Sequence, residues 1–188
     1  YNRHPTTCLY VFHSLIYKGY LNSFLKQLAA KLIMDTPITL CRYGEIFLKG
    51  NNRAFFERAL VNSIRQRVSG SVVAVRNRIL VTTDNPDSQN KLRTVFGLIS
   101  FSPATQLPID INEISKTALS ILASKKFSTF AIQAQRLTKT GPTSAELNCA
   151  VGDIVQKATN ARVDLDNPDV AVGIEIIGNH AYVFTEKT

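Results

Sequence analysis

Residues 71–83 have the sequence SVVAVRNRILVTT and decide the fold class of this chain. Two short runs rich in β-branched residues, 71–75 and 78–83, flank the dipeptide Arg76-Asn77. Strands separated by such a two-residue polar connection form a β-hairpin. The stretch therefore predicts an antiparallel pair of strands in the first half of the chain.

A helix and a strand are expected before this hairpin. Four apolar residues recur at every fourth position and give a helix one apolar face: Phe56, Leu60, Ile64 and Val68. Gly70 suits the end of that helix. Upstream, residues 38–48 (ITLCRYGEIFL) are β-prone, with partial alternation of apolar and polar side chains. Residues 49–52 (KGNN) have the composition of a turn, and asparagine is a good N-cap.

The elements expected after the hairpin complete a known arrangement. Residues 85–87 (NPD) start a second, short helix that ends near Phe96, before Gly97. Residues 98–107 are expected to be extended, and Pro103 indicates an edge position or a bulge because proline has no N–H to donate. The order β-α-β-β-α-β is the ferredoxin-like arrangement, an antiparallel sheet with two helices on one face.

A second α/β domain is predicted to follow. Its expected elements are helices over 110–126 and 145–159 and strands over 127–137, 161–165, 170–177 and 181–186. Ser144 is the expected N-cap of the second helix, and Gly178-Asn179 is the turn between the last two strands. The sequence thus predicts an α+β protein with domains at 35–104 and 105–188, unless the second begins nearer residue 90.

The distribution of charge favours a polyanionic partner. The 188 residues carry a formal net charge of +8, and the pI is about 9.6. Residues 35–104 contain ten basic and five acidic groups, whereas residues 105–188 contain eight and nine. Lysine and arginine neutralise phosphates and release counterions, so this balance favours nucleic acid. A basic surface that is merely solvated has the same composition, and charge alone does not reject it.

Cysteine and histidine spacing gives no sign of a metal site or a disulfide framework. Cys8, Cys41 and Cys149 are odd in number and widely spaced, and the last two are interpreted as small core residues. This usage fits a reducing cytoplasm. The three histidines are scattered and lack the spacing of metal ligands.

Residues 1–34 form an atypical N-terminal extension that is apolar and free of acidic residues. Polar and basic residues interrupt every apolar run before it reaches the ~18–20 residues that a membrane-spanning helix needs. Met34 is the only methionine and directly precedes the first domain. Our hypothesis is that translation naturally starts at Met34; the alternative is an added helix that packs on the domain.

Two groups of segments resemble known families. Residues 42–53 (RYGEIFLKGNNR) and 55–57 (FFE) resemble the opening of tRNA 4-thiouridine synthetases, the tRNA sulfurtransferases that are also tied to thiamine biosynthesis. Residues 130–139 (FAIQAQRLTK), 163–169 (VDLDNPD) and 172–176 (VGIEI) are similar to THUMP domains, the RNA-binding modules of several tRNA-modifying enzymes. The resemblance covers about residues 35–187. It implies an N-terminal ferredoxin-like domain, a THUMP domain and a role in docking the acceptor end of tRNA for thiolation.

The expected RNA contacts come from three places in the chain. They are Lys49, Asn51 and Arg53 at the entry to the first helix, Arg76 and Arg78 at the hairpin turn, and Arg136, Lys139, Thr140 and Ser144 around the loop after the THUMP strand. A helix N-terminus and arginine side chains both suit phosphate. Ordinary helix capping and solvated charges are the alternative interpretation.

The chain departs from the synthetases in one respect. Their catalytic domain carries a phosphate loop of the form Ser-Gly-Gly-x-Asp-Ser and downstream cysteines, and neither is present in this sequence. No catalytic residue or cofactor is therefore expected here, and ATP belongs to a catalytic domain supplied in cis or in trans. Homodimers are a further expectation from the resemblance.

Two alternatives to thiolation stay open from the sequence. One is a THUMP accessory subunit for a tRNA acetyltransferase or methyltransferase, against which the Arg42–Ile46 segment weighs. The other is a ferredoxin-like scaffold that binds proteins or small ligands, which the near-neutral second half favours.

Overall fold

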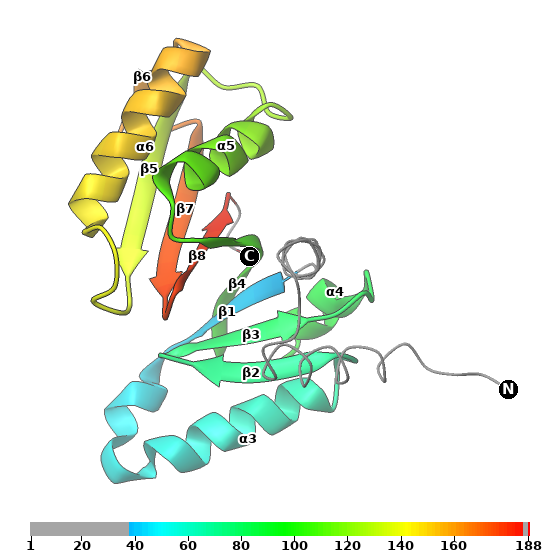
Figure 1. Cartoon of the computed structure of the whole chain (residues 1–188). Coiled ribbons are helices and arrows are strands. Elements are labelled where there is room, and N and C mark those ends of the chain that lie inside the picture. Colours follow the sequence, from blue (N-terminus) through cyan, green and yellow to red (C-terminus); the bar gives the residue numbers. More distant parts are fainter. Residues whose placement is uncertain (1–37, 186–187) are drawn as a thin grey trace, which may run out of the picture. The chain divides into compact units, whose positions relative to one another are not determined.

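A computed structural model describes residues 38–185 and residue 188 (Figure 1). The hypotheses on residues 1–34, including a start at Met34, lie outside the described residues. Within the described part of the chain, no helix combines the length and apolar character needed to cross a membrane.

The first half has the predicted ferredoxin-like order (Figure 1). Its elements are β1 (Ile38–Tyr43), the 3-10 segment η1 (Glu45–Asn52), α3 (Arg53–Arg65), β2 (Ser71–Val75), β3 (Arg78–Thr82), α4 (Ser88–Arg93) and β4 (Leu98–Pro108). The four strands are antiparallel and lie in the order β2-β3-β1-β4. The sequence pattern therefore predicted both the class and the topology of this domain.

One apolar core joins the two helices to one face of this sheet. Ile64 of α3 and Leu92 of α4 are buried in the same cluster as Cys41, Ile79 and Phe101 of the strands. The face predicted for α3 is confirmed at Leu60 and Ile64, which are buried, while Phe56 at its start is exposed. The helix ends at Arg65, earlier than predicted, and Val68 is buried just beyond its end. Cys41 is a core residue, as predicted.

The hairpin turn is also confirmed. Arg76 and Asn77 have φ values of 43° and 66°, and β2 and β3 pair from Val75↔Arg78 to Ser71↔Thr82. Positive φ at both central residues is the geometry of a type I′ turn, whose twist matches that of the flanking strands.

The strand predicted over residues 38–48 is wrong in its second part. β1 ends at Tyr43, and residues 45–52 form the 3-10 segment. The pairing of β1 with β4 shifts between Arg42 and Tyr43, and a Cβ at Gly44 would collide with the side chain of Ile99 on β4. The chain therefore leaves the sheet at this shift in pairing, where Gly44 lies against the side chain of Ile99. Asn52 is the N-cap residue of α3, as the sequence predicts, but its side chain makes no capping hydrogen bond in the described structure.

The second half continues the same sheet. Its elements are α5 (Ile111–Leu122), β5 (Thr129–Arg136), α6 (Ser144–Thr159), β6 (Arg162–Val163), β7 (Val170–Ile177) and β8 (His180–Phe184). The eight strands lie in the order β2-β3-β1-β4-β8-β7-β5-β6. β5 is parallel to β6 and β7, whereas β7-β8 and β4-β8 are antiparallel.

β4 is the strand that the two halves share. Its residues 98–104 pair with β1, and its residues 105–108 pair with β8. Pro103 pairs with Thr39 of β1 two residues before the ladder to β8 begins, so its missing N–H falls where β4 lacks β8 as a neighbour. Phe101, two residues earlier on β4, exchanges backbone hydrogen bonds with Thr188, so the edge position of Pro103 stays a prediction.

Two predictions for α6 are corrected by the structure. Thr143, and not Ser144, is the N-cap: its hydroxyl accepts from the backbone N–H of Glu146, whose carboxylate accepts from the N–H of Thr143. This reciprocal pair is a capping box. Cys149 is exposed and is not a core residue, because the buried face of α6 is formed by Leu147 and Val151, one turn apart.

Candidate nucleic-acid interface

Three arginines line one open pocket of about 540 Å³, and residues from both halves of the chain contribute to its lining. Its lining residues are Arg53, Arg76, Asn77, Gln135, Arg136 and Leu137, and none of these described residues is acidic. We call this set the arginine pocket.

The arginines arrive from three different elements. Arg53 begins α3, Arg76 lies in the β2-β3 turn, and Arg136 is the last residue of β5. Arg53 Nη2 donates to Asn77 Oδ1, which ties the helix start to the hairpin turn. Arg136 Nη1 donates to the carbonyl oxygen of Gly141, 3.2 Å away, in the loop before α6.

The electrostatics of the pocket suit an anion. Arg53 forms an ion pair with Glu57 on the same helix, and Glu57 Oε2 lies 3.8 Å from Arg53 Nε. Such a partly exposed pair neutralises little of the guanidinium charge. Planar guanidinium groups offer several N–H donors in a fixed geometry that matches phosphate oxygens.

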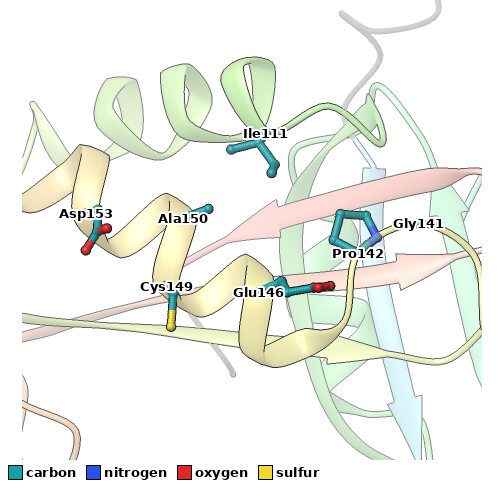
Figure 2. A pocket seen from close by; sticks show the side chains of 7 residues that line it. All are labelled: Ile111, Gly141, Pro142, Glu146, Cys149, Ala150 and Asp153. Atoms are coloured by element: carbon teal, nitrogen blue, oxygen red, sulfur yellow. The ribbon is translucent and has the colours of Figure 1, made fainter.

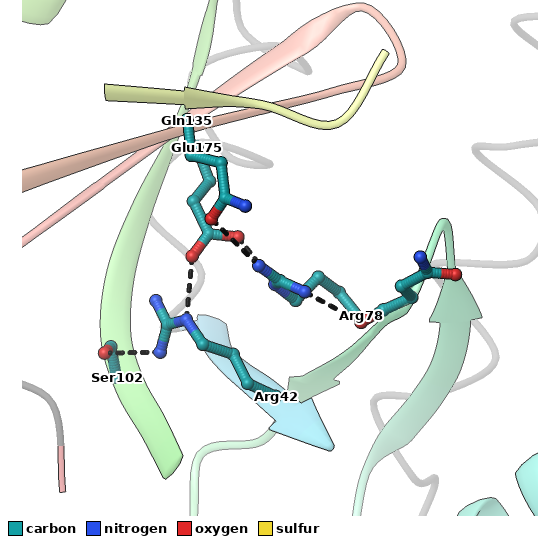
Figure 3. A network of polar contacts seen from close by, with 6 residues as sticks. Arg42, Arg78, Ser102, Gln135 and Glu175 are labelled. Carbon is teal, nitrogen blue, oxygen red and sulfur yellow. Dashed lines mark hydrogen bonds and ion pairs between the residues drawn. The ribbon is translucent and has the colours of Figure 1, made fainter. Parts of the chain in front are cut away.

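A buried ionic network lies behind the pocket (Figure 3). The carboxylate of Glu175 on β7 accepts from Arg42 Nε on β1 and from Arg78 Nε on β3, each at 2.7 Å. Arg42 Nη1 also donates to Ser102 Oγ at 3.0 Å, and Arg78 Nη2 donates to Gln135 Oε1 at 3.2 Å. The network therefore connects both domains and reaches the pocket through Gln135.

A second contact supports Arg53 from the core side. The hydroxyl of Tyr43 donates to Glu57 Oε2 at 2.9 Å, on the carboxylate that also faces Arg53. Burial, together with this hydrogen bond, raises the pKa of Tyr43 to about 12. Tyr43 is therefore a neutral hydrogen-bond donor over the whole physiological range.

The predicted contact residues fall into separate groups. Arg53, Arg76 and Arg136 meet in the arginine pocket. Arg78 points inward to Glu175, with a side chain that is 12% exposed. Asn51, Lys139 and Thr140 are exposed outside the pocket lining, Ser144 is half-buried, and the side chain of Lys49 lies outside the described residues.

Four residues of this region were not predicted as site residues. Asn77, Gln135 and Leu137 line the pocket, and Glu175 holds the network behind it. A signal for Glu175 was available, because it is the only charged residue in the otherwise apolar run 170–177 (VAVGIEII), and buried charges are almost always paired. Asn77 and Gln135 adjoin predicted residues but carry no charge that marks them.

A second hollow between α5 and α6 has a different character (Figure 2). It is lined by Ile111, Gly141, Pro142, Glu146, Cys149, Ala150 and Asp153. Hydrogen bonds from the backbone and hydroxyl of Thr143 lower the pKa of Glu146, which keeps this carboxylate ionised. Two carboxylates and no cation among these residues make the hollow unsuited to phosphate.

Metal binding finds no support in the described part of the chain, where His, Cys, Asp and Glu side chains form no group of three that could hold an ion.

Comparisons with known proteins divide the chain at the same place as the sheet. Residues 38–102 match the family model of the ThiI ferredoxin-like domain, and residues 109–186 match that of the THUMP domain. A probable tRNA sulfurtransferase of Methanocaldococcus jannaschii is 34% identical over 174 residues, which cover 84% of this chain and 46% of the relative. The chain thus spans less than half the length of this curated relative.

Two solved structures resemble most of the chain. PH1313 from Pyrococcus horikoshii is 34% identical, with a TM-score of 0.74 over 80% of this chain and 54% of its own. A 4-thiouridine synthetase solved in complex with RNA and ATP is 28% identical, with a TM-score of 0.69 over 82% of this chain and 42% of its own.

Proposed function

Since the chain carries a ThiI ferredoxin-like domain followed by a THUMP domain, we propose that it is a tRNA-binding module for 4-thiouridine formation. In this proposal it docks the acceptor end of a tRNA, so that a distant uridine reaches the catalytic domain of a tRNA sulfurtransferase.

The observation that carries the proposal is the arginine pocket. Arg53 and Arg76 come from one domain and Arg136 from the other, so a single phosphate backbone segment would contact both domains at once. An RNA acceptor stem offers phosphate rails and a wide minor groove to such a surface. The related synthetase was solved in complex with RNA, which supports the same partner here.

Thiolation is favoured over other tRNA modifications by the first domain. Residues 38–102 match the ThiI ferredoxin-like domain, which points to thiolation, whereas the THUMP domain matched by residues 109–186 is not tied to one enzyme by its name. In our proposal the ATP-dependent step belongs to a catalytic domain that acts in cis or in trans, in the cytoplasm. A homodimer would present two such modules.

The proposed contacts have different roles. Arg53, Arg76 and Arg136 bind phosphates in the pocket, and the exposed Asn51, Lys139, Thr140 and the Lys49 segment extend the surface around it. Arg78 does not contact phosphate in this proposal, since its guanidinium already donates to Glu175 and Gln135. Its role is to hold the residues around the pocket in place.

The first test is binding of the full chain to bulk tRNA over a salt series, with a DNA duplex of similar size for comparison. About six phosphate contacts give a log–log slope of roughly −4 to −5. Arg76→Glu and Arg136→Glu are each expected to weaken tRNA binding severalfold and to reduce that slope by about 1.

The matched control is Lys116→Glu, which makes the same change of charge at an exposed position of α5 outside the pocket. It is expected to leave tRNA affinity close to that of the unaltered chain. Equal binding to tRNA and DNA, or equal losses in all three variants, would contradict a dedicated tRNA interface.

A further inference from the structure

Glu175 occupies an unusual place for a carboxylate. It lies within β7, whose residues 172–177 are all buried, and is itself 3% exposed. Removing a carboxylate from water carries a large free-energy cost unless cations and hydrogen bonds compensate for it. The compensation here comes from two arginines of the other domain.

Those two arginines face each other on the ferredoxin-like sheet. Arg42 of β1 and Arg78 of β3 are direct partners in the antiparallel register, and each side chain is 12% exposed. Like charges directly opposite each other destabilise a strand pair. The ferredoxin-like domain therefore contains a repulsion that only the THUMP domain relieves, by placing Glu175 between the two guanidinium groups.

The geometry of this bridge admits one arrangement of the two domains. Each carboxylate oxygen accepts from a different arginine, Oε1 from Arg42 and Oε2 from Arg78, at 2.7 Å in both cases. The Arg42 guanidinium also stacks on the ring of Phe184, with 4.5 Å between Cζ and the ring centroid. A shift of β7 along β1 would break at least one of these contacts.

The bridge is continuous with the arginine pocket on both sides. Arg78 follows the hairpin turn that carries Arg76, and it donates to the backbone oxygen of Asn77 at 3.0 Å. On the other side, Arg78 Nη2 contacts Gln135, the neighbour of Arg136 in β5. Fixing Arg78 against Glu175 therefore fixes the distance between the two halves of the pocket.

We propose that Glu175 is a positioning residue for RNA binding: by bridging Arg42 and Arg78 it holds the two halves of the arginine pocket in the register that one RNA segment requires. The inference rests on the proposed function, since it assigns to the same pocket the residue that shapes it. Glu175 itself touches no RNA in this account.

Two variants test the bridge in opposite ways. Glu175→Asp keeps the charge but is one methylene shorter, so it cannot reach both arginines. It is expected to fold, to lower affinity for bulk tRNA about tenfold and to reduce the salt slope by about 1 to 2, with unchanged binding to a DNA duplex. If Glu175 mattered only for stability, Glu175→Asp would lower the melting temperature and leave the salt slope unchanged.

Glu175→Gln separates positioning from charge. It raises the net positive charge by one, which by counterion release alone would tighten RNA binding. If Glu175 positions the two halves of the arginine pocket, Glu175→Gln is instead expected to bind RNA more weakly. The control is Glu113→Gln, which makes the same change at an exposed site in the first turn of α5 and is expected to bind tRNA as well as or better than the unaltered chain.

The inference is overturned if folded Glu175→Asp binds tRNA with unaltered affinity and slope, or if folded Glu175→Gln binds more tightly, as Glu113→Gln does. If Glu175→Gln does not fold, the result for Glu175→Asp decides.

If the unaltered chain shows no preference for tRNA, the proposed function fails. The effect of the bridge on the orientation of the two domains is then measured by amide residual dipolar couplings. A changed orientation of β2-β3 relative to β5 in Glu175→Asp supports the bridge, and an identical orientation overturns it.

Discussion

At the scale of single residues, Arg76 combines an unfavourable backbone conformation with a place in the pocket. Its φ of 43° lies in the left-handed region, where asparagine and glycine are preferred in a type I′ turn. We expect Arg76→Asn to raise the free energy of unfolding by about 0.5–1 kcal/mol and to weaken tRNA binding severalfold. Urea denaturation and tRNA titration of the same preparation measure both effects.

The decisive outcome for Arg76→Asn is a gain in the free energy of unfolding together with a loss of tRNA affinity. Loss of stability would show that the arginine side chain supports the turn, and unaltered binding would remove Arg76 from the interface. The neighbouring Asn77 is unsuitable for this test, because it also accepts the hydrogen bond from Arg53.

At the scale of elements, the start of α6 offers a matched pair of hydroxyl residues. Thr143 caps the helix and forms the capping box with Glu146, whereas Ser144 is the first helical residue. Thr143→Ala is expected to lower the free energy of unfolding by about 1 kcal/mol, and Ser144→Ala by much less. Urea denaturation of the two variants distinguishes them, and equal losses would contradict the assignment of the cap.

Local sequence signals identified most elements but not all of their ends. The hairpin, the apolar face of α3 and the order of elements along the chain follow from spacing and turn residues alone. The early end of β1 does not, because its pairing shifts against β4, a strand more than fifty residues further along the chain. Thr143 and Ser144 were equally good caps by type, and only the reach of Glu146 distinguishes them.

At the scale of the whole molecule, one glycine makes room for a side chain at the contact between domains. Gly173 of β7 lies opposite Phe184 of β8, and a Cβ there would collide with the phenyl ring on which Arg42 stacks. Gly173→Ala is expected to lower the free energy of unfolding by about 1–3 kcal/mol in urea denaturation.

The control for this change is a second glycine with room for a methyl group. A Cβ at Gly152, inside α6, would lie 3.9 Å from the nearest side-chain atom, on Ile132. Gly152→Ala is expected to stabilise the chain by about 0.5–1 kcal/mol, because alanine favours the helix interior. Similar effects of the two substitutions would contradict the close packing at Gly173.

The candidate site was predictable by residue but not by arrangement. Arg53, Arg76 and Arg136 are recognisable from charge and position, yet they meet only in the folded sheet, in which β5 lies next to β7 and is separated from β4 by β7 and β8. That strand order depends on pairings between distant segments, which periodicity does not reveal. The inward turn of Arg78 has the same origin, since its partner Glu175 lies 97 residues away.

The shared strand β4 affects how the two domains can be separated or recombined during evolution. A crossover or an engineered cut between residues 104 and 105 would sever one strand that completes two ladders, and would leave each product with an unpaired sheet edge. The shared strand therefore favours the inheritance, or the transplantation, of both domains as one piece.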